Sequence, residues 1–333
     1  MTKEYQLSWD LQPKPIVLKD YPSTTYFCVH PLLSYCKIAF TKFGTGALNF
    51  SLKYSFDQET WYNYTLGEEL TLVEHVYFKG NNSEICNNYA GIHFSSSLPC
   101  YISGKLKSLL NEDLTATVTA VHVNPVNSVT SGLFLGNHNI YKADGLILDM
   151  YLSNSITAGC YARMFKNCSS LQAGPSIALA DMRTNGDSFA EMYANCESLT
   201  AAPSINVHYN DTCARMFFGC KKLIDISNLS ITQTAVPYEG LYEMFMNCSS
   251  LAKPLSISSV TSVGQRGLVG MFKGCSNLGV YSASSAEHDT QWVLNFTTDH
   301  RRNVEAMLEG TKGDITALIP SSGTDTYNYT YYI

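Results

Sequence analysis

The sequence predicts a mixed α/β protein in which an N-terminal antiparallel β-sandwich is followed by a solenoid of short repeats. Short alternations of apolar and polar residues, typical of half-buried strands, run through the first 125 or so residues. A motif of nearly constant spacing then returns five times in the second half. We therefore divide the chain into a sandwich-like domain (1–127), the repeats with degenerate end caps (128–320) and an aromatic C-terminal tail (321–333).

The clearest strand signal lies in the N-terminal half. Between Leu48 and Phe56 every even position is apolar or aromatic and every odd position is polar, which is the pattern of a strand with one buried face. A turn at 57–60 leads into a second strand at 61–64. We expect further strands at 25–29, 37–41, 70–78 and 91–94, and a short helical link at 105–110. Short strands at this spacing favour an antiparallel sandwich.

The repeat has the form Met-aromatic-x-x-Cys-x-x-Leu. Its methionines are 28, 24, 28 and 27 residues apart, within the range of roughly 20–29 residues found in leucine-rich repeats. Cysteine is too rare to recur so regularly by chance, so we assign these residues to a structural core. The core set is Met164, Phe165, Cys168, Leu171, Met192, Cys196, Leu199, Met216, Cys220, Leu223, Met244, Cys248, Leu251, Met271, Cys275 and Leu278.

Each repeat is predicted to contain one short helix and one short strand. Methionine, cysteine and leucine stand at i, i+4 and i+7, which places them on one face of a helix. Alternating runs such as Ile205-x-Val207 and Leu229-x-Ile231 follow, and these predict strands. Degenerate copies at 133–140 and 307–311 are expected to cap a leucine-rich-repeat-like solenoid, because one unit alone cannot bury its apolar face.

These residues resemble the BspA-type leucine-rich repeats of surface proteins from gut bacteria of the Bacteroides group and from their phages. The segments that are close to the core motif of the family are Gly159–Leu171 and Leu199–Pro203. Tyr77–Asn82 and Ile102–Leu110 also resemble segments that precede the repeats in some members, so the resemblance covers roughly residues 75–320. The chain departs from the family in the third repeat, which lacks the proline, and in the irregular step of 24 residues between Met192 and Met216. The resemblance implies adhesion or surface display. It transfers no binding residue, since the family has no fixed binding motif.

Composition argues against several classes of function. Charged residues make up only 15% of the chain, and the net charge is −6, so there is no basic footprint for nucleic acid. No run of 18 apolar residues exists that would predict membrane insertion. The N-terminus lacks the apolar core of a signal peptide, so we expect either that a signal has been removed or that export does not use that route.

No catalytic residue, metal site or cofactor is predicted. The nearest approach to a metal cluster is Cys28-x-His30 with Cys36, which lacks a fourth ligand at matched spacing and is better explained as strand residues. The repeat cysteines are expected to be inert, reduced core thiols, because helices of neighbouring repeats pack too far apart for disulfides. A glycan-active enzyme would need a pair of carboxylates, and no such pair is evident in the sequence.

Binding is expected at the two ends of the molecule. The predicted outward positions of the repeat strands are small or polar, at Ala178, Asn206, Ser230 and Ser256, whereas tight interfaces usually contain aromatic or arginine anchors. The aromatic candidates are Trp9, Trp61, Tyr64, Trp292, Tyr327, Tyr329, Tyr331 and Tyr332. For the terminal tyrosines two interpretations stay open: a contact strip, or an edge strand that completes the last repeat.

Together these features predict a non-enzymatic virion protein of a phage, in a tail, fibre or capsid decoration. Its expected partners are other virion proteins or a host-surface protein or glycan, and it is a possible homo-oligomer. The alternative is a bacterial cell-surface adhesin whose export signal has been removed.

Overall fold

The computed structural model describes residues 15, 25–86, 90–112, 114, 132–148, 155–156, 160–177, 183–184, 187–207, 213–279, 291–298, 301–312 and 325–332. Regular structure in these residues consists of strands and two short 3₁₀ helices, without an α-helix. The predicted mixed α/β class is therefore wrong, and so is the solenoid of helix-plus-strand units. No helix in the described residues is long and apolar enough to span a membrane.

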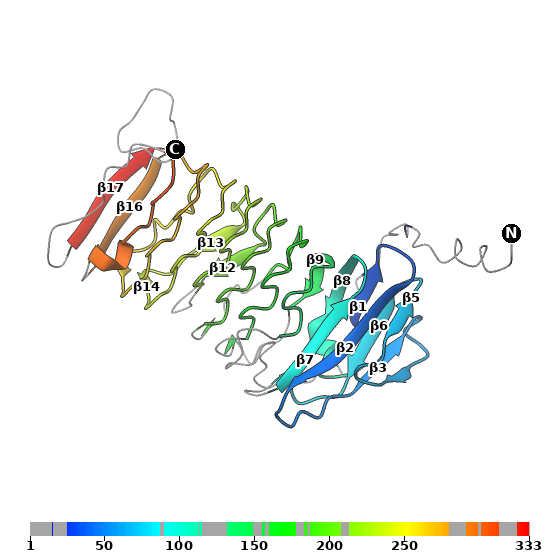
Figure 1. Ribbon diagram of the computed structural model, residues 1–333. Coiled ribbons are helices and arrows are strands. Elements are labelled where there is room, and N and C mark those ends of the chain that lie inside the picture. The colour runs from blue at the N-terminus through cyan, green and yellow to red at the C-terminus, as the bar shows by residue number, and fades with distance from the viewer. Residues whose placement is uncertain are drawn as a thin grey trace, which may run out of the picture.

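Two facing sheets form the N-terminal end of the molecule (Figure 1). Phe40 of the smaller sheet contacts Phe27 and Phe78 of the larger one, with ring centroids 6.1 and 4.9 Å apart. This agrees with the predicted sandwich, although β8 and β9 pair in parallel. The larger sheet has the order β4 (Tyr62–Tyr64), β3 (Leu52–Ser55), β6 (Val76–Gly80), β1 (Phe27–Pro31), β8 (Cys100–Lys105) and β9 (Ile140–Ile147); the smaller has β5 (Leu70–Leu72), β2 (Cys36–Gly44) and β7 (Ala90–Ser96). The link η1 (Leu106–Leu109) is a single 3₁₀ turn.

The sandwich and the repeats share one core. Strand β9 extends the larger sheet in parallel, and Lys142 within it bridges in parallel to Ala173 of the first repeat. The ring of Phe134 stacks on Phe27 of the sandwich and on Phe165 of the first repeat. The predicted domain boundary at 127 lies outside the described residues.

The Met-aromatic-x-x-Cys segments are chains of tight turns. The residue before each methionine and the residue before each cysteine have positive φ; in the first repeat these are Arg163 (58°) and Asn167 (64°). An α-helix requires negative φ throughout. Two left-handed residues four positions apart therefore exclude the helix that the i, i+4, i+7 spacing predicts.

Hydrogen bonds to the next repeat take the place of helical ones. The N–H groups of Arg163, Phe165 and Asn167 donate to carbonyl oxygens of the second repeat, at 2.9, 2.9 and 2.7 Å. The residues between them close turns within their own repeat, as Met164 does to the carbonyl of Tyr161. The same alternation recurs in the following repeats, so each N–H is satisfied without a helix.

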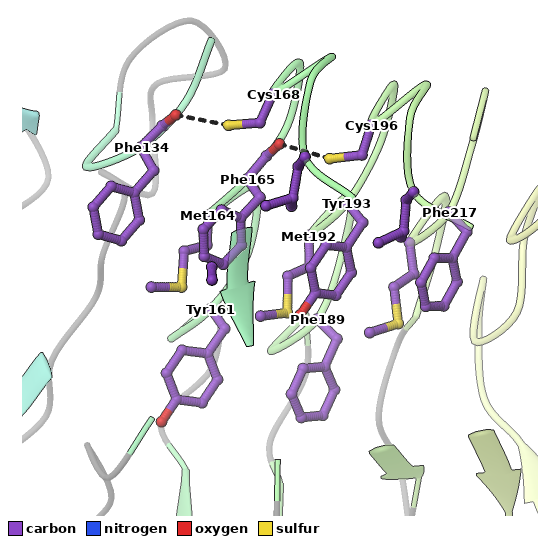
Figure 2. Packing of buried hydrophobic residues seen from close by; sticks show 14 of the residues in the cluster. Phe134, Tyr161, Met164, Phe165, Cys168, Phe189, Met192, Tyr193, Cys196 and Phe217 are labelled. Carbon is purple, nitrogen blue, oxygen red and sulfur yellow. Dashed lines mark hydrogen bonds between the residues drawn. The ribbon is translucent and has the colours of Figure 1, made fainter. Parts of the chain in front are cut away.

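The buried side chains form columns that run along the stack (Figure 2). All sixteen residues of the predicted repeat core are buried, with exposures of 0%. The aromatic rings stack almost in parallel at centroid distances of 5.3–5.7 Å, with interplanar angles of 1–11°, in the order Phe134, Phe165, Tyr193, Phe217, Phe245 and Phe272. We call this column the aromatic ladder.

Short parallel strands lie on another side of the stack. Strands β12 (Ile205–Val207) and β13 (Leu229–Ile231) pair in parallel where the alternating runs predict strands. The pair β10 (Ser155–Ile156) and β11 (Arg183–Thr184) has two residues each. The run at 255–257 is buried at both ends but is not a strand.

A four-stranded sheet forms the C-terminal end, opposite the sandwich (Figure 1). Its order is β14 (Ala235–Val236), β15 (Ser262–Val263), β16 (Gln291–Thr298) and β17 (Asp325–Tyr332). The 3₁₀ helix η2 (Arg301–Val304) precedes the degenerate last copy. Trp292 meets Phe272 edge-on at 84°, which ends the parallel stacking of the aromatic ladder.

Candidate functional site

Trp61 is held at the edge of the sandwich by the turn that precedes β4. Asp57 accepts hydrogen bonds from the N–H groups of Glu59 and Thr60, and Ser55 donates to the same carboxylate. These donors stabilise the ionised form and lower the pKa of Asp57 to about 2. The indole N–H of Trp61 donates to the carbonyl of Gln58 at 3.1 Å. The turn therefore fixes the orientation of the indole while leaving it half-buried.

Positive charge lies against this ring. The Nζ atom of Lys79 is 4.2 Å from the centroid of the Trp61 ring, and the Tyr26 ring meets Trp61 edge-on at 4.9 Å. Lys53 and Lys79 both contact the carboxylate of Glu112, at 2.8 and 3.2 Å. The hydrogen bond from Lys53 is the largest cause that lowers the pKa of Glu112. Two lysines share one carboxylate, so this group carries one net positive charge.

More aromatic residues lie along the same edge. Tyr54 contacts Phe56 and Tyr62, with ring centroids 5.8 and 5.5 Å apart. Tyr62 is 50% exposed and Phe56 is 37% exposed, and they are among the most exposed large apolar residues of the described chain. Strand β4 is the edge strand of its sheet. Lys53 pairs with Lys79, and Tyr54 pairs with Phe78 at the next position, so the Trp61–Lys79 and Tyr54–Tyr62 groups lie on opposite faces of this edge. We call the two groups together the β4-edge aromatic surface; its residues are Tyr26, Tyr54, Phe56, Trp61, Tyr62 and Lys79.

The other predicted binding residues do not gather there. Tyr64 is buried; its hydroxyl accepts from the N–H of Phe40 and donates to the carbonyl of Glu68, so it braces the sandwich. Trp292 is buried at the end of the aromatic ladder and donates to the carbonyl of Leu255 at 2.9 Å. Trp9 lies outside the described residues. The terminal residues Tyr327, Tyr329, Tyr331 and Tyr332 belong to β17, whose backbone pairs with β16.

A second surface cluster was missed by the sequence analysis. The guanidinium groups of Arg266 and Arg215 lie 4.4 and 5.2 Å from the ring centroid of Tyr242. Their charges are paired with Glu239 and Glu243, each at 2.6 Å. Arg215 and Glu243 occupy the same position of adjacent repeats, just before the methionine, so the alternation of charge was visible in the sequence. Because each cation has its own carboxylate, we interpret this cluster as bracing between repeats.

The buried cysteines and histidine have chemistry that does not favour catalysis. His30 is fully buried in β1, contacts Ser103 Oγ at 2.7 Å, and burial followed by the nearby His75 lowers its pKa to about 3. Burial raises the pKa of Cys28 and of the repeat thiols well above the usual range. These thiols stay protonated at neutral pH, and a thiol is a weak nucleophile compared with a thiolate. All eleven cysteines are buried, and none of them is in a disulfide.

The residues Cys28, His30 and Cys36, the nearest approach to a metal cluster in the sequence, are divided between the two sheets of the sandwich. Cys36 lies on β2 in the opposite sheet and approaches the carbonyl of Leu98 at 3.5 Å. Among the described residues, no group of three or more His, Cys, Asp or Glu side chains is arranged to hold a metal ion. Comparisons of the chain with family models, with curated proteins and with solved structures find no match.

Proposed function

We propose that the protein is a non-enzymatic structural or attachment component of a phage virion, in which the stacked repeats hold two contact surfaces apart. The observation that carries the proposal is the unbroken core from Phe27 in the sandwich to Trp292 at the other end. Backbone hydrogen bonds and stacked rings join each repeat to the next, so bending the stack would break many contacts together. Such a body suits the transmission of position or force between partners.

The β4-edge aromatic surface is the contact site we propose for the N-terminal end. Tyr62 and Phe56 offer exposed aromatic area, and Trp61 with Lys79 adds a fixed indole and a net positive charge. Tyrosine and tryptophan are enriched among the residues that contribute most to binding at interfaces. The partner we propose is another virion protein or an acidic protein or glycan of the host surface.

Fractionation of a producing culture tests the assignment. Quantitative mass spectrometry should find the chain enriched in purified phage particles relative to the cell envelope and the cytoplasm. Enrichment in the envelope would instead support a cell-surface adhesin, which the resemblance of the repeat motif favours as the second candidate. A chain confined to the cytoplasm would overturn both.

A variant pair tests the contact surface. We expect the double variant Trp61→Ala/Tyr62→Ala to lower incorporation into particles at least tenfold, with an unchanged circular dichroism spectrum. The matched control is Val73→Ala, because Val73 is also on the sandwich and is 58% exposed. Equal incorporation of both proteins would remove the β4-edge aromatic surface from the proposal.

A further inference from the structure

Among the described residues, strand β17 is the outermost strand of the C-terminal sheet. All eight of its residues pair with β16 in one unbroken antiparallel register, from Asp325 opposite Thr298 to Tyr332 opposite Gln291. In the sheet order β17 is the last strand, and Figure 1 shows it at the end of the molecule. The described register contains no bulge that would twist this edge away from a neighbour.

The sequence of β17 lacks the features that usually protect an edge strand. Native edges are blunted by lysine, proline, a bulge or a very short strand, because their free N–H and C=O groups invite pairing with another chain. Between Asp325 and Tyr332 there is no lysine, arginine or proline, and the strand is longer than the typical length of about five or six residues. Tyrosine and threonine, which favour strands, fill six of its eight positions.

The same strand is close to a sequence palindrome. The segment from Thr326 to Thr330 reads Thr-Tyr-Asn-Tyr-Thr in both directions, with Asn328 at its centre. Antiparallel pairing of two identical copies about Asn328 therefore places threonine opposite threonine and tyrosine opposite tyrosine. Cross-strand pairs between aromatic residues and between threonines stabilise antiparallel sheets. A two-fold axis through the Asn328 pair also closes the assembly, since each copy contributes the same surface.

We propose that two copies of this chain associate by antiparallel pairing of their β17 strands about a two-fold axis at Asn328. The two four-stranded sheets then form one continuous sheet of eight strands across the dimer. The inference extends the proposed function, because it names the partner at the C-terminal end, but its test does not depend on a virion.

Position 328 allows a direct test that spares the buried face. Asn328 is in register with Asn295, whereas the flanking positions are in register with Leu294 and Phe296. Leu294 is fully buried and Trp292, two residues before it, is 3% exposed. Successive residues of a strand alternate between the two faces of the sheet. Position 328 therefore belongs to the face opposite that of Leu294 and Trp292.

Charge substitutions at Asn328 should distinguish pairing about this axis from any other way in which two chains could associate. The full chain should sediment as a dimer, at twice its mass of 36.9 kDa. Asn328→Lys and Asn328→Asp should each weaken dimerisation at least tenfold, because like charges directly opposite each other repel. An equal mixture of the two variants should restore a dimer. Thr326→Lys is the matched control and should stay dimeric, since its opposite residue is Thr330.

Cysteine substitution gives an independent measurement on the same axis. Directly opposite residues in an antiparallel pair have Cα atoms about 4.5–5.5 Å apart, which suits a disulfide. Asn328→Cys should form a covalent dimer on mild oxidation, whereas Thr326→Cys should not, because its two copies are separated by roughly 13 Å along the strands. Circular dichroism of each variant checks that the fold is retained.

A monomeric full chain would overturn the inference. So would a dimer that persists in both Asn328 charge variants, or efficient cross-linking of Thr326→Cys. None of these results bears on whether the chain enters phage particles, so failure here is distinguishable from failure of the proposed function. Removal of the whole strand is avoided because it would unpair β16 as well.

Discussion

The thiol of Cys196 donates a hydrogen bond to the main-chain carbonyl of Phe165 in the preceding repeat, with 3.1 Å between sulfur and oxygen. The same contact links Cys168, Cys220, Cys248 and Cys275 to the aromatic residue one layer earlier, at 3.0–3.1 Å. In the degenerate copy the side-chain amide of Asn137 replaces the thiol and donates to the carbonyl of Phe94 at 3.3 Å. The cysteine column is therefore a set of buried donors as well as small apolar groups.

Removing one of these donors should destabilise the stack. Cys196→Ala removes the side-chain donor to the carbonyl of Phe165, which keeps the backbone N–H of Cys168, and we expect a loss of about 0.5–1.5 kcal/mol in the free energy of unfolding. Cys196→Ser keeps a donor and should lose less. Urea denaturation of the two variants measures the difference. Equal losses would mean that the thiol acts by its volume alone.

A methyl group at Gly274 should be costly for two reasons. The residue has φ +74°, and an added Cβ would clash with the side-chain oxygen of Asn247. The left-handed conformation costs a non-glycine residue about 1–2 kcal/mol, and the clash adds to that. Gly136→Ala is the control, since its φ is also +74° but nothing lies within 4 Å. Gly274→Ala should therefore be the more destabilising change in thermal melts.

The clash predicts a measurable coupling. In the double variant Gly274→Ala/Asn247→Ala the opposing oxygen is absent, so the combined loss should be smaller than the sum of the single losses. Strict additivity would show that the Asn247 side chain moves aside freely.

The buried face of the repeat should matter far more than its exposed neighbour. Leu199 is fully buried, and Leu199→Ala should cost about 2–5 kcal/mol. Glu197 pairs with Lys221 at 2.8 Å, but both side chains are about half exposed. Glu197→Ala should therefore cost well under about 1 kcal/mol. Similar midpoint shifts in urea for the two variants would contradict the observed packing.

His30 should make the fold sensitive to acid. Its folded pKa of about 3 lies below the usual value, so the unfolded chain binds a proton more readily. Its contribution to stability is complete above about pH 6.5 and is lost progressively as the pH falls toward 3. The variant His30→Gln should flatten the pH dependence of the unfolding free energy in this window. An unchanged slope would assign the acid sensitivity to other groups.

The thiols should be chemically silent in the folded protein. All eleven are buried and none is in a disulfide, and burial raises the pKa of Cys275 to about 12. Alkylation at neutral pH should be slow under native conditions and should reach all eleven positions once the unreduced chain is unfolded. Mass spectrometry measures both states. A bridged pair such as Cys196 with Cys220 would contradict the described packing.

The sequence identified the repeated core but not the backbone that carries it. Apolar spacing at i, i+4 and i+7 is common to a helix and to this chain of turns, so the pattern of Met164, Cys168 and Leu171 could not separate them. The distinguishing signal lies one residue before each cysteine, where the five copies have Asn167, Asn195, Gly219, Asn247 and Gly274. Asparagine and glycine are the residues that accept a left-handed conformation most readily.

The candidate site was predictable only in part. The prominence of Trp61 in the sequence marked one end of the sandwich, and the structure adds Lys79 and Tyr26 beside it. The sequence could not predict that Lys79 lies beside Trp61, because these residues are far apart in the chain and the pairing of β3 with β4 and β6 brings them together. Tyr64 and Trp292 show the converse. A large aromatic residue with a polar atom suits a binding surface, yet in both cases a main-chain partner satisfies that atom inside the core.

The edge-on contact between Trp292 and Phe272 fixes the length of the aromatic ladder. Parallel rings can be added one after another at about 5.5 Å per layer without disturbing their neighbours. A perpendicular ring offers no parallel face to a further layer, so the position of Trp292 determines which repeat is the last in the stack. Gain or loss of one repeat of 24–28 residues upstream would change the separation of the two ends by one such step, while leaving both end surfaces intact. The length of the molecule would thus change in steps of about 5.5 Å, one ring-to-ring distance for each repeat.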